Sequence, residues 1–192
     1  MKPVSNRLIL AAFLMTLAWS ACTTSQTAKE PASLTQRQVA DDFVTFLEKQ
    51  LIETADAMPE DKYSFVPTSG EFRGVRSFGE QVKHLAAANH ILAAAIVGEP
   101  APPDAGDETG PETVRTKTEI LNYLKQSFVA LHRAAAAIPD KNPVVQGVPI
   151  SPLAGRTTPL GLAMEALIHT ENHYGQMVEY LRMNGIVPPA SR

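Results

Sequence analysis

Helical periodicity in four separate stretches is the feature that most constrains the fold of this chain. In each stretch apolar residues recur at three- and four-residue intervals over roughly 22 to 28 residues, which predicts a long amphipathic helix. The stretches cover residues 33–58, 77–98, 113–138 and 157–184. None of the segments between them has the pattern of a convincing strand. We therefore expect an all-α protein, a four-helix bundle with long irregular loops.

Capping residues mark the starts of these helices. Ser77 can cap the second helix because Glu80 follows three residues later, and Pro159 suits the first turn of the fourth. In the first helix, helical spacing predicts an apolar stripe made of Val39, Phe43, Phe46, Leu47, Ile52 and Ala55.

The connecting segments differ in composition. Residues 63–67 carry two aromatic side chains and are predicted to form an extended loop that packs through them. Residues 101–111 contain three prolines and two glycines among acidic residues, which is typical of a mobile surface linker. Residues 140–158 hold short extended pieces, none of them long enough for a sheet.

Residues 1–21 are predicted to be a secretory signal. Lys2 and Arg7 precede an apolar run over residues 8–19, which is shorter than the roughly 20 residues that span a bilayer. We expect a polar tether over residues 22–33 and the folded domain over residues 34–189. The protein is therefore expected to be exported.

Cys22 is the only cysteine, so no intrachain disulfide can form. It follows two small residues, as in a bacterial lipobox whose cysteine becomes the lipidated first residue. Trp19 departs from that pattern, because Leu is usual there. The alternative is ordinary cleavage nearby, for instance after Ser20, without a lipid. These alternatives predict a membrane-anchored lipoprotein or a periplasmic protein of a bacterial cell envelope.

The charge balance argues against a nucleic-acid partner. The chain has 17 basic and 20 acidic residues, a net charge of −3. Loss of Lys2 and Arg7 with the signal leaves 15 basic residues and a net charge of −5. A mildly acidic domain without a basic cluster does not match the electrostatic pattern of nucleic-acid binding.

Two histidines four residues apart suggest a metal site. On a helix, His169 and His173 project from one face with Cβ atoms roughly 6 Å apart, which suits two imidazoles binding one cation. His84 is the better candidate for a third ligand, because it borders the apolar stripe of its helix whereas His90 lies on the opposite side. His132 has no second histidine at helical spacing.

Other interpretations of these residues remain open at the level of sequence. His169 and His173 could be core histidines satisfied by backbone or by a carboxylate such as Glu165. We expect His90 and His132 to be solvated or paired locally, and assign them no function. Residues 170–172 are expected to face away from the pair.

Several sharper motifs are absent. Residues 169–173 read His-Thr-Glu-Asn-His, which is neither H-E-x-x-H nor H-x-x-E-H, so the zinc-protease arrangement is missing. No pair of Glu-x-x-His motifs is present, as a di-iron carboxylate bundle would need. Glycine-rich phosphate loops and nucleophile elbows are also missing.

The histidine-bearing segments resemble the DinB/YfiT superfamily. The resemblance rests on residues 78–86 and 169–189, with support from residues 63–67, and covers about residues 35–189. It implies a four-helix bundle, often a homodimer, that holds a divalent ion, zinc or nickel. By motif position, the resemblance implies the ligands His84, His169 and His173.

The resemblance implies several activities. Characterised relatives include thiol-dependent transferases and isomerases, and many members have no known activity. We expect a metal-dependent hydrolase or a thiol-dependent transferase acting on a small-molecule substrate, with Glu165, Gln176 or Tyr180 orienting water or substrate. An export signal weighs against thiol transfer, because low-molecular-weight thiols are scarcer outside the cytoplasm. The alternative is a non-catalytic binding or scaffold module with a structural or vestigial metal site.

Overall fold

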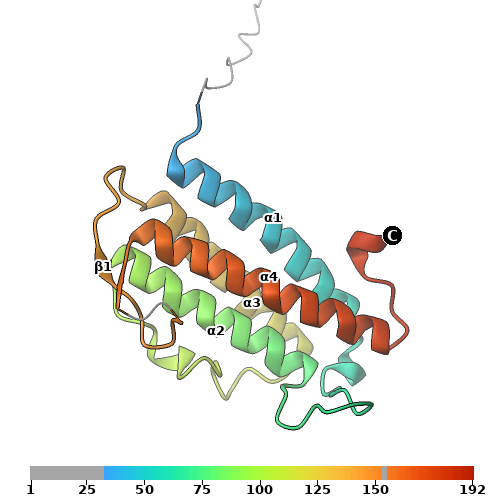
Figure 1. The fold of residues 1–192 in the computed structure, drawn as a ribbon. Coiled ribbons are helices and arrows are strands. Elements are labelled where there is room, and N and C mark those ends of the chain that lie inside the picture. The colour runs from blue at the N-terminus through green and yellow to red at the C-terminus, as the bar shows by residue number, and fades with distance from the viewer. Residues whose placement is uncertain (1–32, 153–154) are drawn as a thin grey trace, which may run out of the picture. The chain divides into compact units, whose positions relative to one another are not determined.

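Four helices make up most of the folded chain, which a computed structural model describes at residues 33–152 and 155–192. Figure 1 shows them packed side by side. Their bounds are α1 Gln36–Ala57, α2 Phe78–Val97, α3 Lys117–Ala136 and α4 Pro159–Met183. Short 3-10 helices are η1 Glu60–Lys62, η2 Pro103–Ala105 and η3 Pro189–Ser191, and strands β1 Val145–Gln146 and β2 Arg156–Thr157 form one antiparallel pair. The predicted all-α bundle is confirmed.

Side-chain caps determine where the helices start. Ser77 accepts a hydrogen bond from the backbone N–H of Glu80, while the Glu80 carboxylate accepts one from the Ser77 N–H. Thr158 caps α4 immediately before Pro159. α3 begins at Lys117 rather than near residue 113, because Thr116 forms its own capping box with the helix that follows.

α2 is the most enclosed of the helices. It packs against α3 and α4, and α1 packs against the same two helices. α2 and α4 lie side by side and run in opposite directions (Figure 1). Glu80 is the only residue of α2 that is exposed. Polar side chains on α2 that face α4 are therefore inside the bundle.

Three of the six residues predicted for the apolar stripe of α1 do not face the core. Val39, Phe43 and Phe46 are exposed, the two phenylalanines by 54% and 56%. The residues that face the core are Ala40, Val44, Leu47, Leu51 and Ala55. α1 carries apolar residues on two faces, and periodicity alone does not say which face the other helices cover.

The loop between α1 and α2 packs through its aromatic side chains, as predicted. The Tyr63 ring lies edge-on to Phe78 with centroids 5.3 Å apart, and its hydroxyl donates a hydrogen bond to the Ala55 carbonyl. Phe65 packs against Tyr180 in the same way, at 5.8 Å. These contacts attach the start of α2 to α1 and to the end of α4.

The loop between α2 and α3 is more than the surface linker that its composition suggested. Ala105 in η2 is fully buried, and Gly110 is buried as well. Glu108 has a positive φ of 71°, which non-glycine residues seldom adopt, while its carbonyl oxygen contacts a histidine of α2. This loop therefore covers part of the bundle.

The compact unit begins at Ser33. Among the described residues, no helix has the length and apolar character needed to cross a membrane. The predicted signal over residues 1–21, the tether up to residue 32 and the lipidation site Cys22 all lie outside the described residues.

Candidate metal centre

The three histidines predicted as metal ligands lie together in the structure. His84 comes from α2, and His169 and His173 come from consecutive turns of α4. Their Nε2 atoms form a triangle with sides of 3.1 Å (His84–His173), 3.2 Å (His84–His169) and 3.0 Å (His169–His173). Nitrogens bound to one ion at about 2.0–2.1 Å lie roughly 2.9–3.4 Å from one another. This group could therefore hold a metal ion.

Burial keeps the three imidazoles neutral at physiological pH. Burial is the main cause that lowers the pKa of His169 to about 4 and that of His173 to about 3, and neighbouring histidines and Arg76 add to it. Burial and then Arg76 also lower the pKa of His84. A neutral ring carries one proton, and a ring protonated at Nδ1 presents a lone pair at Nε2.

Contacts at Nδ1 determine which nitrogen keeps the proton. Nδ1 of His84 donates to the backbone carbonyl of Glu108 at 3.0 Å, because a carbonyl can only accept. Nδ1 of His173 lies 2.5 Å from Nε2 of the Gln81 side-chain amide, whose N–H also donates to Oε1 of Gln176 at 2.7 Å. An amide N–H donates, so Nδ1 of His173 accepts there and the neutral ring carries its proton on Nε2, which a metal ion at Nε2 would displace. His84 directs its Nε2 lone pair into the triangle, as metal-binding histidines do.

His169 is the least enclosed of the three. Its Nδ1 atom is buried, yet no group within the described chain forms a hydrogen bond with it. A buried polar atom without a partner costs free energy, and such atoms are rare. No hydrogen bond at Nδ1 therefore holds the tautomer of His169, and a cation at Nε2 would fix it.

Comparison with known protein families selects the same region. A model of the DinB superfamily matches residues 45–177, well over half of the chain. This chain belongs to the DinB superfamily. The match includes all of α2 and α3 and both histidines of α4, so the predicted family is confirmed. Curated proteins give no match.

The polar residues predicted to assist the site are held in place by different hydrogen-bond partners. Glu165 is buried and accepts a hydrogen bond from the Ser151 hydroxyl at 2.8 Å. Gln176 reaches His173 only through Gln81. The Tyr180 hydroxyl donates to the carbonyl of Arg76 at 3.0 Å, a contact that ties it to the loop before α2.

Two residues at this DinB site were missed in the sequence. Gln81 lies one turn before His84 on α2, and its polar side chain on an inward face was a signal that could have been used. Glu108 lies in the loop after α2, and its carboxylate is 3.8 Å from Nδ1 of His84. No local pattern points to Glu108, because its role depends on how the loop folds back.

The other two histidines do not behave as predicted. His132 pairs with α1 across the bundle rather than locally: its Nδ1 lies 2.6 Å from Asp41 and its Nε2 lies 3.1 Å from Glu48. His90 is half-buried beside the Tyr123 ring, and its Nε2 has no hydrogen-bond partner in the segments that the structure covers. Neither residue contributes to the three-histidine group.

Thr170 also differs from the prediction that it would face away. It is buried, and its hydroxyl donates to the Asn89 side-chain oxygen at 3.3 Å. Asn89 in turn donates to Ser127 of α3 at 3.3 Å. This chain of hydrogen bonds joins three helices one turn away from His173 and satisfies polar groups inside the bundle.

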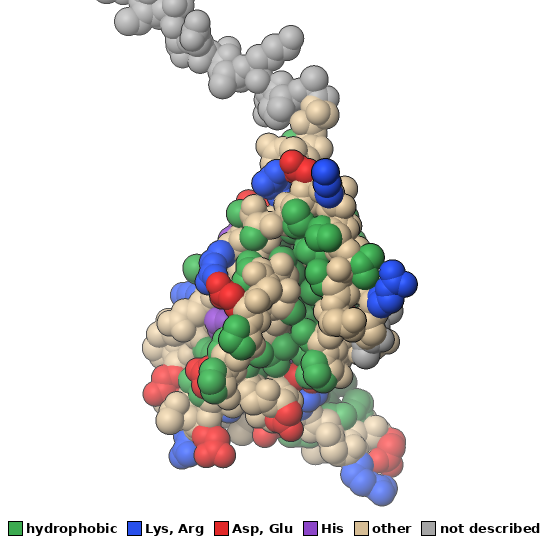
Figure 2. All heavy atoms as spheres, turned by 90° about the vertical axis from the view of Figure 1, so that its left-hand side faces the viewer, with side chains coloured by type: hydrophobic (Ala, Val, Ile, Leu, Met, Phe, Trp, Pro, Cys, Tyr) green, Lys and Arg blue, Asp and Glu red, His purple; other side chains and the backbone are tan. Residues whose placement is uncertain are grey.

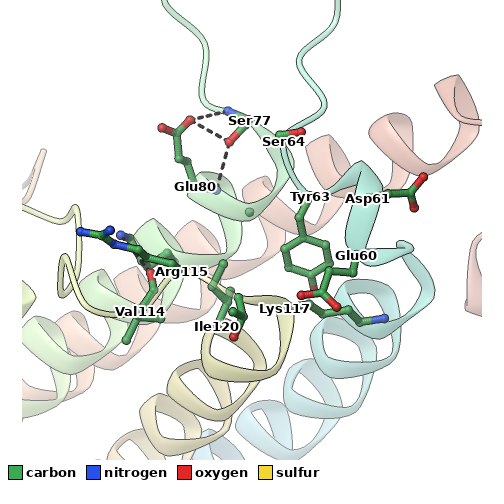
Figure 3. A pocket seen from close by; sticks show the side chains of 13 residues that line it. Glu60, Asp61, Tyr63, Ser64, Ser77, Glu80, Val114, Arg115, Lys117 and Ile120 are labelled. Carbon is green, nitrogen blue, oxygen red and sulfur yellow. Dashed lines mark hydrogen bonds between the residues drawn. The ribbon is translucent and has the colours of Figure 1, made fainter.

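Two cavities differ in their relation to the histidines. A cavity of about 500 Å³ lies between the starts of α2 and α3, and none of the three histidines lines it. Figure 3 shows its Glu80 carboxylate turned to Ser77, as a helix cap. A second cavity of about 260 Å³, here called the His169 cavity, adjoins the site. It is lined by Ala88, Leu92, Glu108, Ile150, Pro152, Glu165, Ile168, His169 and Asn172.

Proposed function

We propose that this DinB protein binds a divalent metal ion through His84, His169 and His173 and uses it in hydrolase or transferase chemistry on a small molecule. The observation that carries the proposal is the triangle of Nε2 atoms, 3.0–3.2 Å apart, on rings whose pKa values are lowered. Three ring nitrogens at this separation match the spacing that one bound cation imposes, and a metal ion would displace any proton shared between them. Imidazole nitrogen suits zinc and nickel, which are the proposed ions.

The number of protein ligands supports a catalytic rather than a purely structural ion. Within residues 33–152 and 155–192, no carboxylate or thiolate joins the three histidines. Structural zinc sites use four protein ligands, whereas catalytic sites use three and leave a position for water or substrate. An ion held here would supply Lewis acidity toward such a ligand.

The residues around the His169 cavity suggest how a substrate is held. Glu165 keeps its carboxylate in place by accepting from Ser151, and it lines the same cavity as His169. Burial raises the pKa of Glu108, whose side chain is also at this cavity. A carboxyl group with a raised pKa can take up or release a proton closer to neutral pH. We assign Glu108 and Glu165 the positioning of substrate and protons.

Metal analysis of the purified domain tests this function. One zinc or nickel ion per chain is expected after purification without chelators. His169→Ala is expected to lose most of the metal, whereas His90→Ala, outside the group, keeps it. Wild-type protein that takes up no stoichiometric metal would refute the proposal.

Ligand access then separates catalysis from the scaffold alternative. In cobalt-substituted protein, azide is expected to change the visible spectrum of the ion, because the proposed site has a position open to small molecules. A spectrum that does not respond to azide would favour a closed, structural site in a non-catalytic module.

We further propose that the protein is exported and anchored through Cys22. Support comes from the sequence of residues 1–22, in which a basic start, an apolar run and small residues precede the cysteine. Wild-type protein is expected in the membrane fraction, and Cys22→Ser is expected to move it to the periplasmic fraction. Unchanged fractionation would argue against lipidation.

A further inference from the structure

The His169 cavity is apolar over most of its wall. Its polar groups are His169, Glu108, Glu165 and Asn172, and the other lining residues are Ala, Leu, Ile and Pro. The Glu165 carboxylate is already bonded to Ser151. An occupant of this cavity therefore meets polar atoms beside the metal centre and hydrocarbon elsewhere.

A second apolar space adjoins this cavity at Ile168. A cleft of about 240 Å³ between α1 and α4, here called the α1–α4 cleft, is also lined by Ile168. Its other lining residues are Phe43, Phe46, Leu47, Met164, Leu167 and Glu171. Ile168 is thus the residue at which the two spaces border each other.

Four apolar side chains along this path are unusually exposed for their type: Phe43, Phe46, Met164 and Ile168. Phe43 and Phe46 belong to the outer face of α1, and Ile168 is 66% exposed. Figure 2 views the end of the bundle at which α1 and α4 begin, where hydrophobic side chains form a strip between charged ones. Contiguous apolar surface of this kind marks a binding site more often than scattered single residues do.

We infer that the substrate of the metal centre carries an apolar alkyl or acyl chain. Its reactive end lies at His169, and the chain runs over Ile168 into the α1–α4 cleft. The inference rests on the proposed function, since it assigns the substrate class of that same centre. Pockets for drug-sized ligands begin at about 300 Å³; each space alone falls below this volume, whereas the two in series exceed it.

Chain-length dependence of binding tests the inference. Acetohydroxamate, hexanohydroxamate and octanohydroxamate share a metal-binding head and differ only in alkyl chain. With zinc-loaded protein, calorimetry is expected to give a dissociation constant that falls about three- to fourfold per added methylene while the chain is being buried. Equal affinities for the three probes would overturn the inference and leave the metal function intact.

Ile168 offers a variant with a matched control. Ile168→Asp is expected to remove most of the gain in affinity from acetohydroxamate to octanohydroxamate. Val129→Asp makes the same kind of change on α3 at a residue that is 67% exposed and lines neither space, and it should keep the gain. Equal losses in both variants would overturn the inference.

An experiment without metal keeps the two proposals distinguishable. In metal-free protein, 1-hexanol is expected to shift the NMR methyl signals of Ile150 and Ile168 but not those of Ile52 and Ile120, which lie outside both spaces. Such shifts in a protein that binds no metal would support the apolar site while the metal function fails. Absence of the shifts overturns the inference.

A second copy of the chain is the competing occupant of the α1–α4 cleft. Sedimentation of wild-type protein and Ile168→Asp decides this point. A dimer that Ile168→Asp abolishes and octanohydroxamate does not dissociate would overturn the inference. A monomer, or a dimer unchanged by Ile168→Asp, supports it.

Discussion

Two parts of this DinB protein use histidine in opposite ways. At the candidate metal centre, the imidazoles of His84, His169 and His173 face one another through Nε2. Between α1 and α3, the single imidazole of His132 is bonded to the carboxylates of Asp41 and Glu48 through both of its nitrogens. The first arrangement gathers three Nε2 atoms around one point, and the second uses both nitrogens of one ring as donors to carboxylates.

The pKa values of the two groups shift in opposite directions. Burial lowers the pKa of His169 and His173, and no carboxylate bonded to these rings opposes it. Burial also lowers the pKa of His132, but hydrogen bonds to Asp41 and Glu48 outweigh burial and raise it overall. The hydrogen-bond partners of a histidine, and not its burial alone, decide its charge. They determine whether the ring stays neutral and can bind a cation or becomes protonated itself.

Removal of one ring from each group should show the largest difference between them. His173→Ala leaves two ligands, and we expect its zinc affinity to fall by at least about 100-fold. His132→Ala should keep wild-type affinity, because its ring contacts only carboxylates of α1. Calorimetric titration with zinc measures both. Equal affinity losses would mean that His132 supports the centre through the fold.

Bound metal should stabilise the protein only through the group formed by His84, His169 and His173. At a free ion concentration about 100 times the dissociation constant, bound metal adds about 2.7 kcal/mol to the free energy of unfolding. Urea unfolding with and without chelator measures this increment. His132→Ala is expected to retain it in full, and His173→Ala to lose it at the same zinc concentration. An increment that survives in His173→Ala would indicate metal binding elsewhere.

Removing a residue that contacts one of the three histidines should lower metal affinity, whereas removing a partner of His132 should not. Gln81→Ala removes the amide that holds Nδ1 of His173, and metal affinity is expected to fall about tenfold. Asp41→Ala, which removes a partner of His132, is expected to leave metal affinity unchanged. Competition with a fluorescent zinc chelator measures both values. An unchanged affinity in Gln81→Ala would show that Gln81 does not orient the ligand.

The two groups should give opposite pH dependence in metal-free protein. Between pH 6.5 and about 4 the unfolded chain protonates His169 more readily than the folded chain, so the His169 contribution lowers stability as pH falls. The raised pKa of His132 contributes stability below pH 6.5 that is lost as pH rises through its folded value.

Of the predicted effects, we expect the change in the free energy of unfolding caused by His132→Ala to be the smallest. His132→Ala should cost less than about 1 kcal/mol, because its carboxylate partners are substantially exposed. The cost should be larger at pH 5.5 than at pH 8.5. Urea unfolding of wild-type and variant protein at both values measures it, with Val129→Asp as a control. A cost that does not change with pH would mean that the pair carries no charge-dependent stability.

The features of the fold that the sequence predicted depend on residues that lie close together in the chain. The cap at Ser77, the proline at the start of α4 and the spacing of His169 and His173 depend on residues within one or two turns. The position of His84 beside the apolar stripe of its helix favoured it as the third ligand, and the family pattern then gave the same residue. The helical architecture and the histidine set could therefore be predicted before any packing was known.

Tertiary structure decided the features that depend on distant partners. Both faces of α1 are apolar, and only packing against α3 and α4 selected Val44 over Phe43 for the core. The Glu108 carbonyl reaches His84 because a loop folds back on α2, and His132 finds Asp41 across the bundle. Sequence spacing fixes neighbours along one helix, whereas contacts between helices depend on their relative rotation and shift, which the burial of the whole core sets.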